Sequence, residues 1–168
     1  MGRNGTMEPF TISFFGHRRI ENLVSVESKL IRIVRDLLKS KVYVDFLVGR
    51  NGDFDQLVSS VVRRTKREYR ADNSSLVLVL PYVTAECRDN EESFLEYYDE
   101  VEICEESAFA HFKSAIRIRN CSMIEKSDLV VCYVEHSSGG AYQAMKYAKK
   151  HHKQIYNLCT FDESGENT

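Results

Sequence analysis

The sequence lacks several features that would place it in a broad class at once. It has no apolar run long enough to cross a bilayer, and its first residues lack the apolar stretch of a signal peptide. Its formal net charge is -2, so it also lacks the excess of basic residues that bulk binding of nucleic acid requires. The net charge does not exclude a local basic patch. These absences favour a cytoplasmic protein with no membrane partner.

Paired cysteines are missing as well. The chain has five widely spaced cysteines: Cys87, Cys104, Cys121, Cys132 and Cys159. An odd number at this spacing fits neither a disulfide framework nor paired zinc ligands, so we expect reduced thiols, no metal and no cofactor.

Internal repeats and low-complexity linkers are absent too, which leaves one folding unit. A chain of 168 residues with 43% hydrophobic content can build one substantial core. We expect a single domain over residues 10–160, a flexible N-terminus over residues 1–9, and a polar tail over residues 161–168.

Strand and helix patterns alternate along the chain. The β-rich runs cover residues 10–15, 42–48, 76–80, 128–134 and 154–158. Helical patterns cover residues 26–38, 53–69, 109–126 and 141–151. This alternation predicts an α/β fold, a Rossmann-like three-layer sandwich. Its five-stranded, mainly parallel sheet has the order 3-2-1-4-5 and helices on both faces.

The acidic stretch over residues 82–107 is less regular. We expect part of it to form a loop or lid over the site, with a short strand near residues 101–104.

Ligands of such sheets bind beyond the carboxyl ends of the strands, near the point where strand order reverses. The first strand ends in Gly16, His17 and Arg18. Glycine permits close approach of a ligand, and the two side chains offer donors to phosphate or a base. A tight turn with two solvated side chains explains the same residues equally well.

The second strand ends in Gly49, Arg50 and Asn51, followed by Asp53 and Asp55. These residues could hold a ribose or a phosphate. A glycine turn with an aspartate N-cap is the better explanation for this segment alone, with Asp53 as the capping residue.

The loop from Glu135 to Gly140 offers the strongest of these sites. It joins an apolar strand to a helix and contains His136, Ser137, Ser138 and Gly139. Free amides and the positive dipole end of a helix N-terminus favour an anion. The loop is not a Walker loop, and an ordinary strand-to-helix turn remains the alternative.

Arg119 and Asn120 lie on the preceding helical segment, just before Met123 and Ile124. One of them is expected to point toward the strand ends. A solvated helix face is the better explanation for Arg117.

Taken together, these segments resemble the SLOG superfamily, in its YpsA-like branch. Phe14-Phe-Gly-His-Arg18 looks like its first-strand signature, and residues 46–55 resemble its second strand and loop. Arg119-Asn120 with residues 123–130 is similar to its next block, and residues 137–141 match its phosphate-side loop. The resemblance spans nearly the whole chain, and the order and spacing of the motifs make the set specific.

The resemblance implies a ligand with phosphate, ribose and a base, since the superfamily includes sensors of nucleotide-derived signals in bacterial and phage defence. It also includes LOG-type phosphoribohydrolases, which carry a Pro-Gly-Gly-x-Gly-Thr loop followed by a glutamate. Here the stretch reads Ser138-Gly-Gly-Ala-Tyr-Gln143, and glutamine cannot serve as a general base. An enzyme of this kind would need a carboxylate in the pocket, and the candidates are Glu135, Asp53 and Asp55. Glu135 is the candidate catalytic residue.

We therefore expect a module that senses or sequesters a nucleotide-derived small molecule. The first alternative is a nucleotide N-glycosidase, and the second is an interaction protein with a vestigial pocket. A homo-oligomer is left open. We further expect Gly16, Gly49 and the loop from Ser137 to Gly140 to line one pocket.

Overall fold

A computed structural model describes residues 8–159. The expected tail over 161–168 and most of the expected flexible N-terminus lie outside the described residues. No helix in the described range is both long and apolar enough to cross a membrane.

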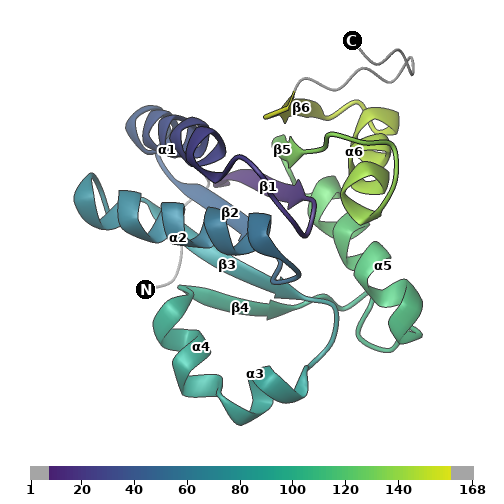
Figure 1. Cartoon of the computed structure of the whole chain (residues 1–168). Helices are drawn as coiled ribbons and strands as arrows, with labels where there is room; N and C mark the ends of the chain where they lie inside the picture. The colour runs from purple at the N-terminus through teal and green to yellow at the C-terminus, as the bar shows by residue number, and fades with distance from the viewer. Residues whose placement is uncertain (1–7, 160–168) are drawn as a thin grey trace.

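The centre of the fold is a six-stranded sheet in which every pairing is parallel. Its order is β4-β3-β2-β1-β5-β6 (Figure 1). The strands are β1 (Phe10–Gly16), β2 (Val44–Val48), β3 (Ser74–Leu80), β4 (Glu100–Ile103), β5 (Leu129–Tyr133) and β6 (Gln154–Asn157). The α/β class and the relative order of the five expected strands are confirmed, and the strand number is corrected to six.

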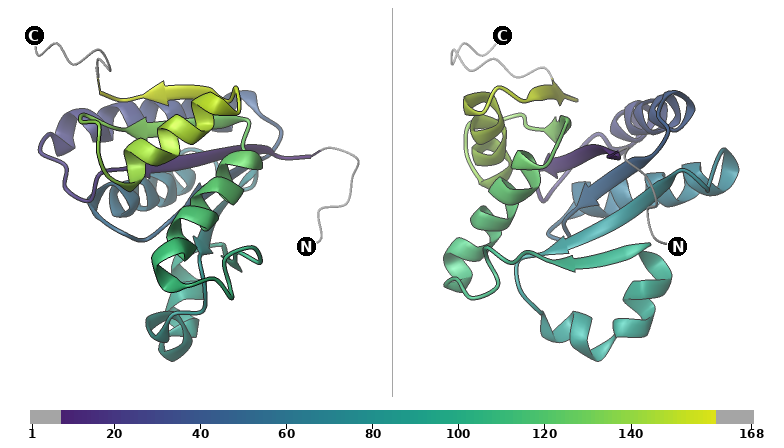
Figure 2. Two further views of the ribbon diagram at one scale, coloured as in Figure 1. Left: turned by 90° about the vertical axis from the view of Figure 1, so that its right-hand side faces the viewer. Right: turned by 180° about the vertical axis from the view of Figure 1, so that it is seen from behind.

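Helices cover both faces of this sheet (Figure 2). They are α1 (Leu23–Ser40), α2 (Asp53–Glu68), α3 (Ala85–Asp89), α4 (Glu91–Tyr97), α5 (Phe112–Glu125) and α6 (Gly140–Lys150). Buried residues of α1, α2 and α4 join one hydrophobic cluster, and those of α5 and α6 join a second. Successive strand residues feed opposite clusters, as with Phe14 in the first and Phe15 in the second.

The acidic segment over residues 82–107 forms α3, α4 and β4 at one edge of the sheet. The short strand expected near residues 101–104 is confirmed as β4, whereas the expected lid is corrected. Strand β4 is short, and its glutamates are exposed, so its sequence lacks the apolar signal of a buried strand. Asp99 anchors it by accepting hydrogen bonds from the backbone N–H of Leu76 at 2.7 Å and from Lys66 Nζ. The segment packs beside β3 and does not cover the carboxyl ends of the central strands.

Candidate functional site

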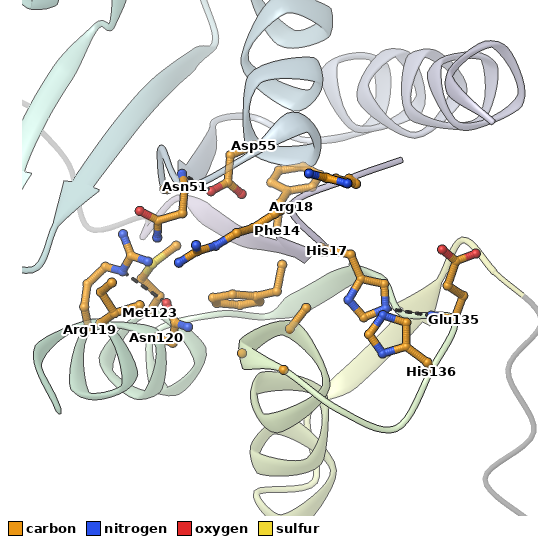
Figure 3. A pocket seen from close by; sticks show the side chains of 18 of the residues that line it. Phe14, His17, Arg18, Asn51, Asp55, Arg119, Asn120, Met123, Glu135 and His136 are labelled. Carbon is orange, nitrogen blue, oxygen red and sulfur yellow. Dashed lines mark hydrogen bonds between the residues drawn. The ribbon is translucent and has the colours of Figure 1, made fainter. Parts of the chain in front are cut away.

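A cavity of about 670 Å³ opens at the carboxyl ends of β1, β2 and β5, beside the N-terminus of α6 (Figure 3). Strand order reverses between β1 and β5, because the chain runs from β1 toward β4 on one side and enters β5 on the other. The cavity therefore lies where open parallel sheets bind ligands.

Most of the predicted ligand-binding residues line this one cavity. They are Gly16, His17, Arg18, Gly49, Asn51, Arg119, Asn120, His136, Gly139 and Gly140, and Glu135 joins them. Arg50, Ser137 and Ser138 do not line it. The expected single pocket for the glycine loops is therefore found, without the contribution expected from the two serines.

Arg50 turns away from the cavity. Its guanidinium donates to Glu86 Oε1 at 2.7 Å and lies 4.7 Å from the centre of the Phe94 ring. It thus joins the loop after β2 to α3 and α4. The correction has a simple physical reason, since this long side chain finds an acid and an aromatic face on the side away from the cavity.

The two serines do not line the cavity either. Ser138 Oγ lies 3.0 Å from His136 Nδ1, and both serines are exposed. The backbone of the loop still reaches the cavity through Gly139, whose φ of 89° lies in the left-handed region that glycine adopts without strain.

Helix α6 directs its N-terminus at the cavity through Gly139, Gly140 and Ala141. A Cβ atom at Gly139 or Gly140 would meet no other atom within 4 Å, so both positions face open space. The first turn of α6 contains no acidic residue. This end of the cavity therefore offers helix amides and positive dipole to an anion, with nothing in the helix to neutralise them.

A pair of stacked histidines forms a second wall. The rings of His17 and His136 lie 3.8 Å apart at an interplanar angle of 6°. His17 Nε2 accepts a 3.0 Å hydrogen bond from the backbone N–H of Glu135, so its proton sits on Nδ1 when the ring is neutral. Burial lowers the pKa of His17, as does His136, while Glu135 opposes them.

The wall opposite the histidines is built around Arg119, which is only 3% exposed. Its guanidinium donates to the backbone oxygen of Val79 at 3.0 Å, and its Nε atom donates to Asn120 Oδ1 at 3.1 Å. Gly49 leaves room for it, since a Cβ there would lie 3.0 Å from an Arg119 nitrogen. Arg119 is thus held by the protein. Its bond to Asn120 Oδ1 orients that side chain and leaves the Nδ2 amide as its donor.

Asp55 lies in the same wall. Its Oδ2 atom accepts the N–H of Asn51 at 2.8 Å. Burial raises the pKa of Asp55, and the Asn51 amide and the charge of Arg119 oppose that rise. The carboxylate is therefore partly committed to holding the loop between β2 and α2.

Two sequence expectations change in this region. Asp53 is not the N-cap of α2, because the helix begins at Asp53 after Gly52, and its carboxylate instead faces the N–H of Ile20 at 3.4 Å. Gly16 has a packing role as well, since a Cβ there would lie 2.2 Å from Cγ of the buried Phe54.

Glu135, the catalytic candidate, lies at the rim and is exposed. Its Oε2 atom accepts from Tyr133 Oη at 3.4 Å, and its carboxylate points away from Arg119 and Asn120 in Figure 3. Gln143 does not line the cavity. Within residues 8–159, no cluster of histidine, cysteine, aspartate or glutamate side chains is arranged to hold a metal ion.

Several lining residues were missed by the sequence analysis: Phe14, Phe15, Arg19, Glu21, Ile116, Met123 and Ala141. Helical spacing signals two of them, because Ile116 and Met123 are three or four positions from Arg119 or Asn120 and share their helix face. Arg19 and Glu21 follow the Gly16 turn and carry no comparable pattern.

Comparison with known structures finds this fold in DNA processing protein A. The protein from Helicobacter pylori, in a study of its single-stranded DNA binding mode, matches with a TM-score of 0.61 and 16% identity over 88% of this chain. The Streptococcus pneumoniae protein matches with the same TM-score and 12% identity, again over 88% of this chain. This chain covers 64% and 49% of those two proteins.

At such low identity the likeness shows the fold alone, a Rossmann-like domain of the kind found in DNA processing protein A. No protein-family model and no curated protein matches the sequence. Membership of the YpsA-like branch stays a prediction.

Proposed function

We propose that this protein binds a phosphate-bearing, nucleotide-derived small molecule in the cavity between β1, β2, β5 and α6. One observation carries the proposal: an acid-free helix N-terminus, free side-chain donors and a stacked aromatic pair meet in one cavity at the reversal of strand order. Helix amides suit phosphate, and the volume lies within the roughly 300–1,000 Å³ typical of small-molecule sites.

Arg18 is the charged donor that supports the phosphate end. It lines the cavity and is exposed, and its guanidinium has no hydrogen-bond or ion-pair partner among residues 8–159. Asn120 and Asn51 offer amide groups to a ribose or base. The role is sensing or sequestration, because the Asp55 carboxylate accepts the backbone N–H of Asn51 and Glu135 lies exposed at the rim.

The likeness to DNA processing protein A raises single-stranded DNA as a second occupant of the same region. Charge favours the small molecule, since the chain has a net charge of -2 and Glu21, Asp55 and Glu135 line the cavity. A long polyanion would meet these carboxylates along its path.

The test is calorimetric titration with nucleoside monophosphates, nucleoside diphosphates, ribose 5-phosphate and a single-stranded oligonucleotide. The proposal predicts saturable binding of at least one phosphorylated small molecule, weakened in Arg18→Ala and unchanged in Arg67→Ala. Arg67 is a matched control, because it is exposed at the opposite end of α2. Binding of the oligonucleotide alone would contradict the proposal, as would equal binding by both variants.

A further inference from the structure

Helix α4 presents an acidic face with an apolar centre. Glu91, Glu92 and Glu96 surround Leu95, which is 54% exposed. All four side chains line one surface hollow. Glu91 and Glu92 precede Leu95 by four and three positions, the spacings that bring helix side chains together. The carboxylates of the three glutamates have no ion-pair or hydrogen-bond partner among residues 8–159. Like charges crowd this face, and a large apolar side chain stays in water.

A basic groove with an apolar floor runs between α1 and α2. Ile31 and the 45%-exposed Tyr69 line its two adjoining hollows, of about 380 Å³ and 250 Å³. Arg32, Arg35 and Lys39 line the larger hollow, and the Arg35 guanidinium lies 5.6 Å from the Tyr69 ring centre.

The groove keeps a positive excess after its own acids are considered. Asp36 and Glu68 are its carboxylates, and Arg64 is paired with Glu27. Arg32 and Lys39 are exposed, and their side chains have no hydrogen-bond or ion-pair partner among the described residues. An acidic, apolar-centred surface would therefore complement the groove in both charge and hydrophobicity.

The acidic face and the basic groove lie on the same side of the sheet. Buried residues from their three helices, such as Leu30 of α1, Val58 of α2 and Phe94 of α4, share one hydrophobic cluster. In Figure 1, α1 and α2 lie beside the central strands and α4 lies below β4. Two complementary patches on one side of the sheet can meet twice when a second copy is related by a two-fold axis.

We propose that the chain forms a two-fold homodimer in which the acidic α4 face of each copy docks in the basic α1–α2 groove of the other. Leu95 enters beside Ile31 and Tyr69, and the glutamates face Arg32, Arg35 and Lys39. Docking relieves the like-charge repulsion on α4 and removes apolar surface from water. The interface is separate from the cavity and does not depend on its ligand.

The test is light scattering coupled to size-exclusion chromatography on the 168-residue protein at low ionic strength. Wild type runs at twice the chain mass of 19.4 kDa. It runs as a monomer in about 1 M sodium chloride, where charges are screened beyond roughly 3 Å. Arg32→Glu with Arg35→Glu, and separately Glu91→Lys with Glu92→Lys, each run as monomers. An equimolar mixture of the two double variants restores the dimer, because every contact then joins opposite charges.

Lys150→Glu, at the exposed end of α6, is the matched control and keeps the dimer. Leu95→Asp is a second probe that leaves the groove intact and also gives a monomer. Circular dichroism checks that each variant is folded. A monomeric wild type, a dimer that survives both double reversals, or a mixture that stays monomeric overturns the proposal. Retention of a single-stranded oligonucleotide by a monomeric wild type, lost in the arginine variant, would assign the groove to a polyanion instead.

Discussion

The backbone N–H of Glu135 donates a 3.0 Å hydrogen bond to Nε2 of His17. This bond joins the loop after β5 to the loop after β1 across the reversal of strand order. The His17 ring also stacks on His136, so the two loops form one continuous wall of the cavity. A ligand at the N-terminus of α6 would contact a wall whose parts hold each other in place.

Stability should fall with acid partly because of His17. Its pKa is lowered in the folded state, chiefly by burial, from an ordinary value of 6.5. Below that value the unfolded chain binds more protons than the folded chain at this site, so stability is lost as pH falls from 6.5 through the lowered pKa.

We therefore expect wild type to lose more stability than His17→Gln when urea unfolding is measured at about pH 7.5 and then at about pH 5.5. The glutamine keeps an acceptor oxygen without titrating. Identical losses in the two proteins would show that His17 is not linked to folding.

Gly16→Ala should destabilise the fold. The added Cβ would lie 2.2 Å from the Phe54 ring, which is buried and stacks on Tyr133. Overpacking of this kind costs about 1–3 kcal/mol. Gly140→Ala is the control, because no atom lies within 4 Å of its added Cβ. Chemical denaturation of the two variants should separate them, and equal stabilities would mean that Phe54 moves aside without cost.

Arg18 and Arg119 should behave oppositely although both line the cavity. Arg18→Ala leaves stability within about 0.5 kcal/mol, as for most surface changes. Arg119→Met leaves the Val79 carbonyl oxygen and Asn120 without their donor and costs roughly 1–3 kcal/mol of stability. Thermal unfolding measures both changes. A stable Arg119→Met protein would contradict the structural role given to Arg119.

Arg18→Ala should instead weaken binding of a nucleoside monophosphate by roughly 1.5–3 kcal/mol if its guanidinium bonds the phosphate directly. Titration calorimetry on wild type and variant gives this difference. Unchanged affinity would place the phosphate away from Arg18.

The N-glycosidase alternative makes a distinct prediction about Glu135. Cleaving a base from a nucleotide usually needs a carboxylate positioned at the sugar. Glu135 is exposed at the rim and accepts from Tyr133 at 3.4 Å, so we expect no release of free base from nucleoside monophosphates. Chromatographic detection of free base, abolished in Glu135→Gln with binding retained, would establish the enzyme and end the sensor interpretation.

Local patterns predicted the central sheet because its strands are continuous apolar or β-rich runs. The unbroken run from Leu76 to Leu80 is buried on both faces, as in any covered parallel strand. The short strand expected near residues 101–104 is found as β4, but its place in the sheet was not predicted. It lies at the edge with alternate residues exposed, and Asp99, which anchors it, looks like one acid among many. The expected lid failed for the same reason, since composition does not say which edge an acidic segment joins.

The site was predicted to the level of loops but not of side chains. Parallel strands bring the loops of Gly16, Gly49 and Gly139 to one edge whatever their sequences. The direction of each side chain depends on partners far along the chain, and Arg50 turns toward Glu86 for that reason. The burial of Arg119 under the loop of Gly49 likewise comes from packing between distant segments.

The central claim is that the N-terminus of α6 holds a phosphate, and Gly140 provides the most direct test of it. Gly140→Asp places a negative charge in the first turn, where it interacts favourably with the positive end of the helix dipole. The variant should therefore keep or increase the stability of the fold. Gly140→Asn adds nearly the same volume without the charge. We predict that calorimetric titration with nucleoside monophosphates shows binding by wild type, weaker or equal binding by Gly140→Asn, and none by the well-folded Gly140→Asp protein. Equal affinities in the aspartate and asparagine variants would contradict the claim, because the anion would then lie elsewhere.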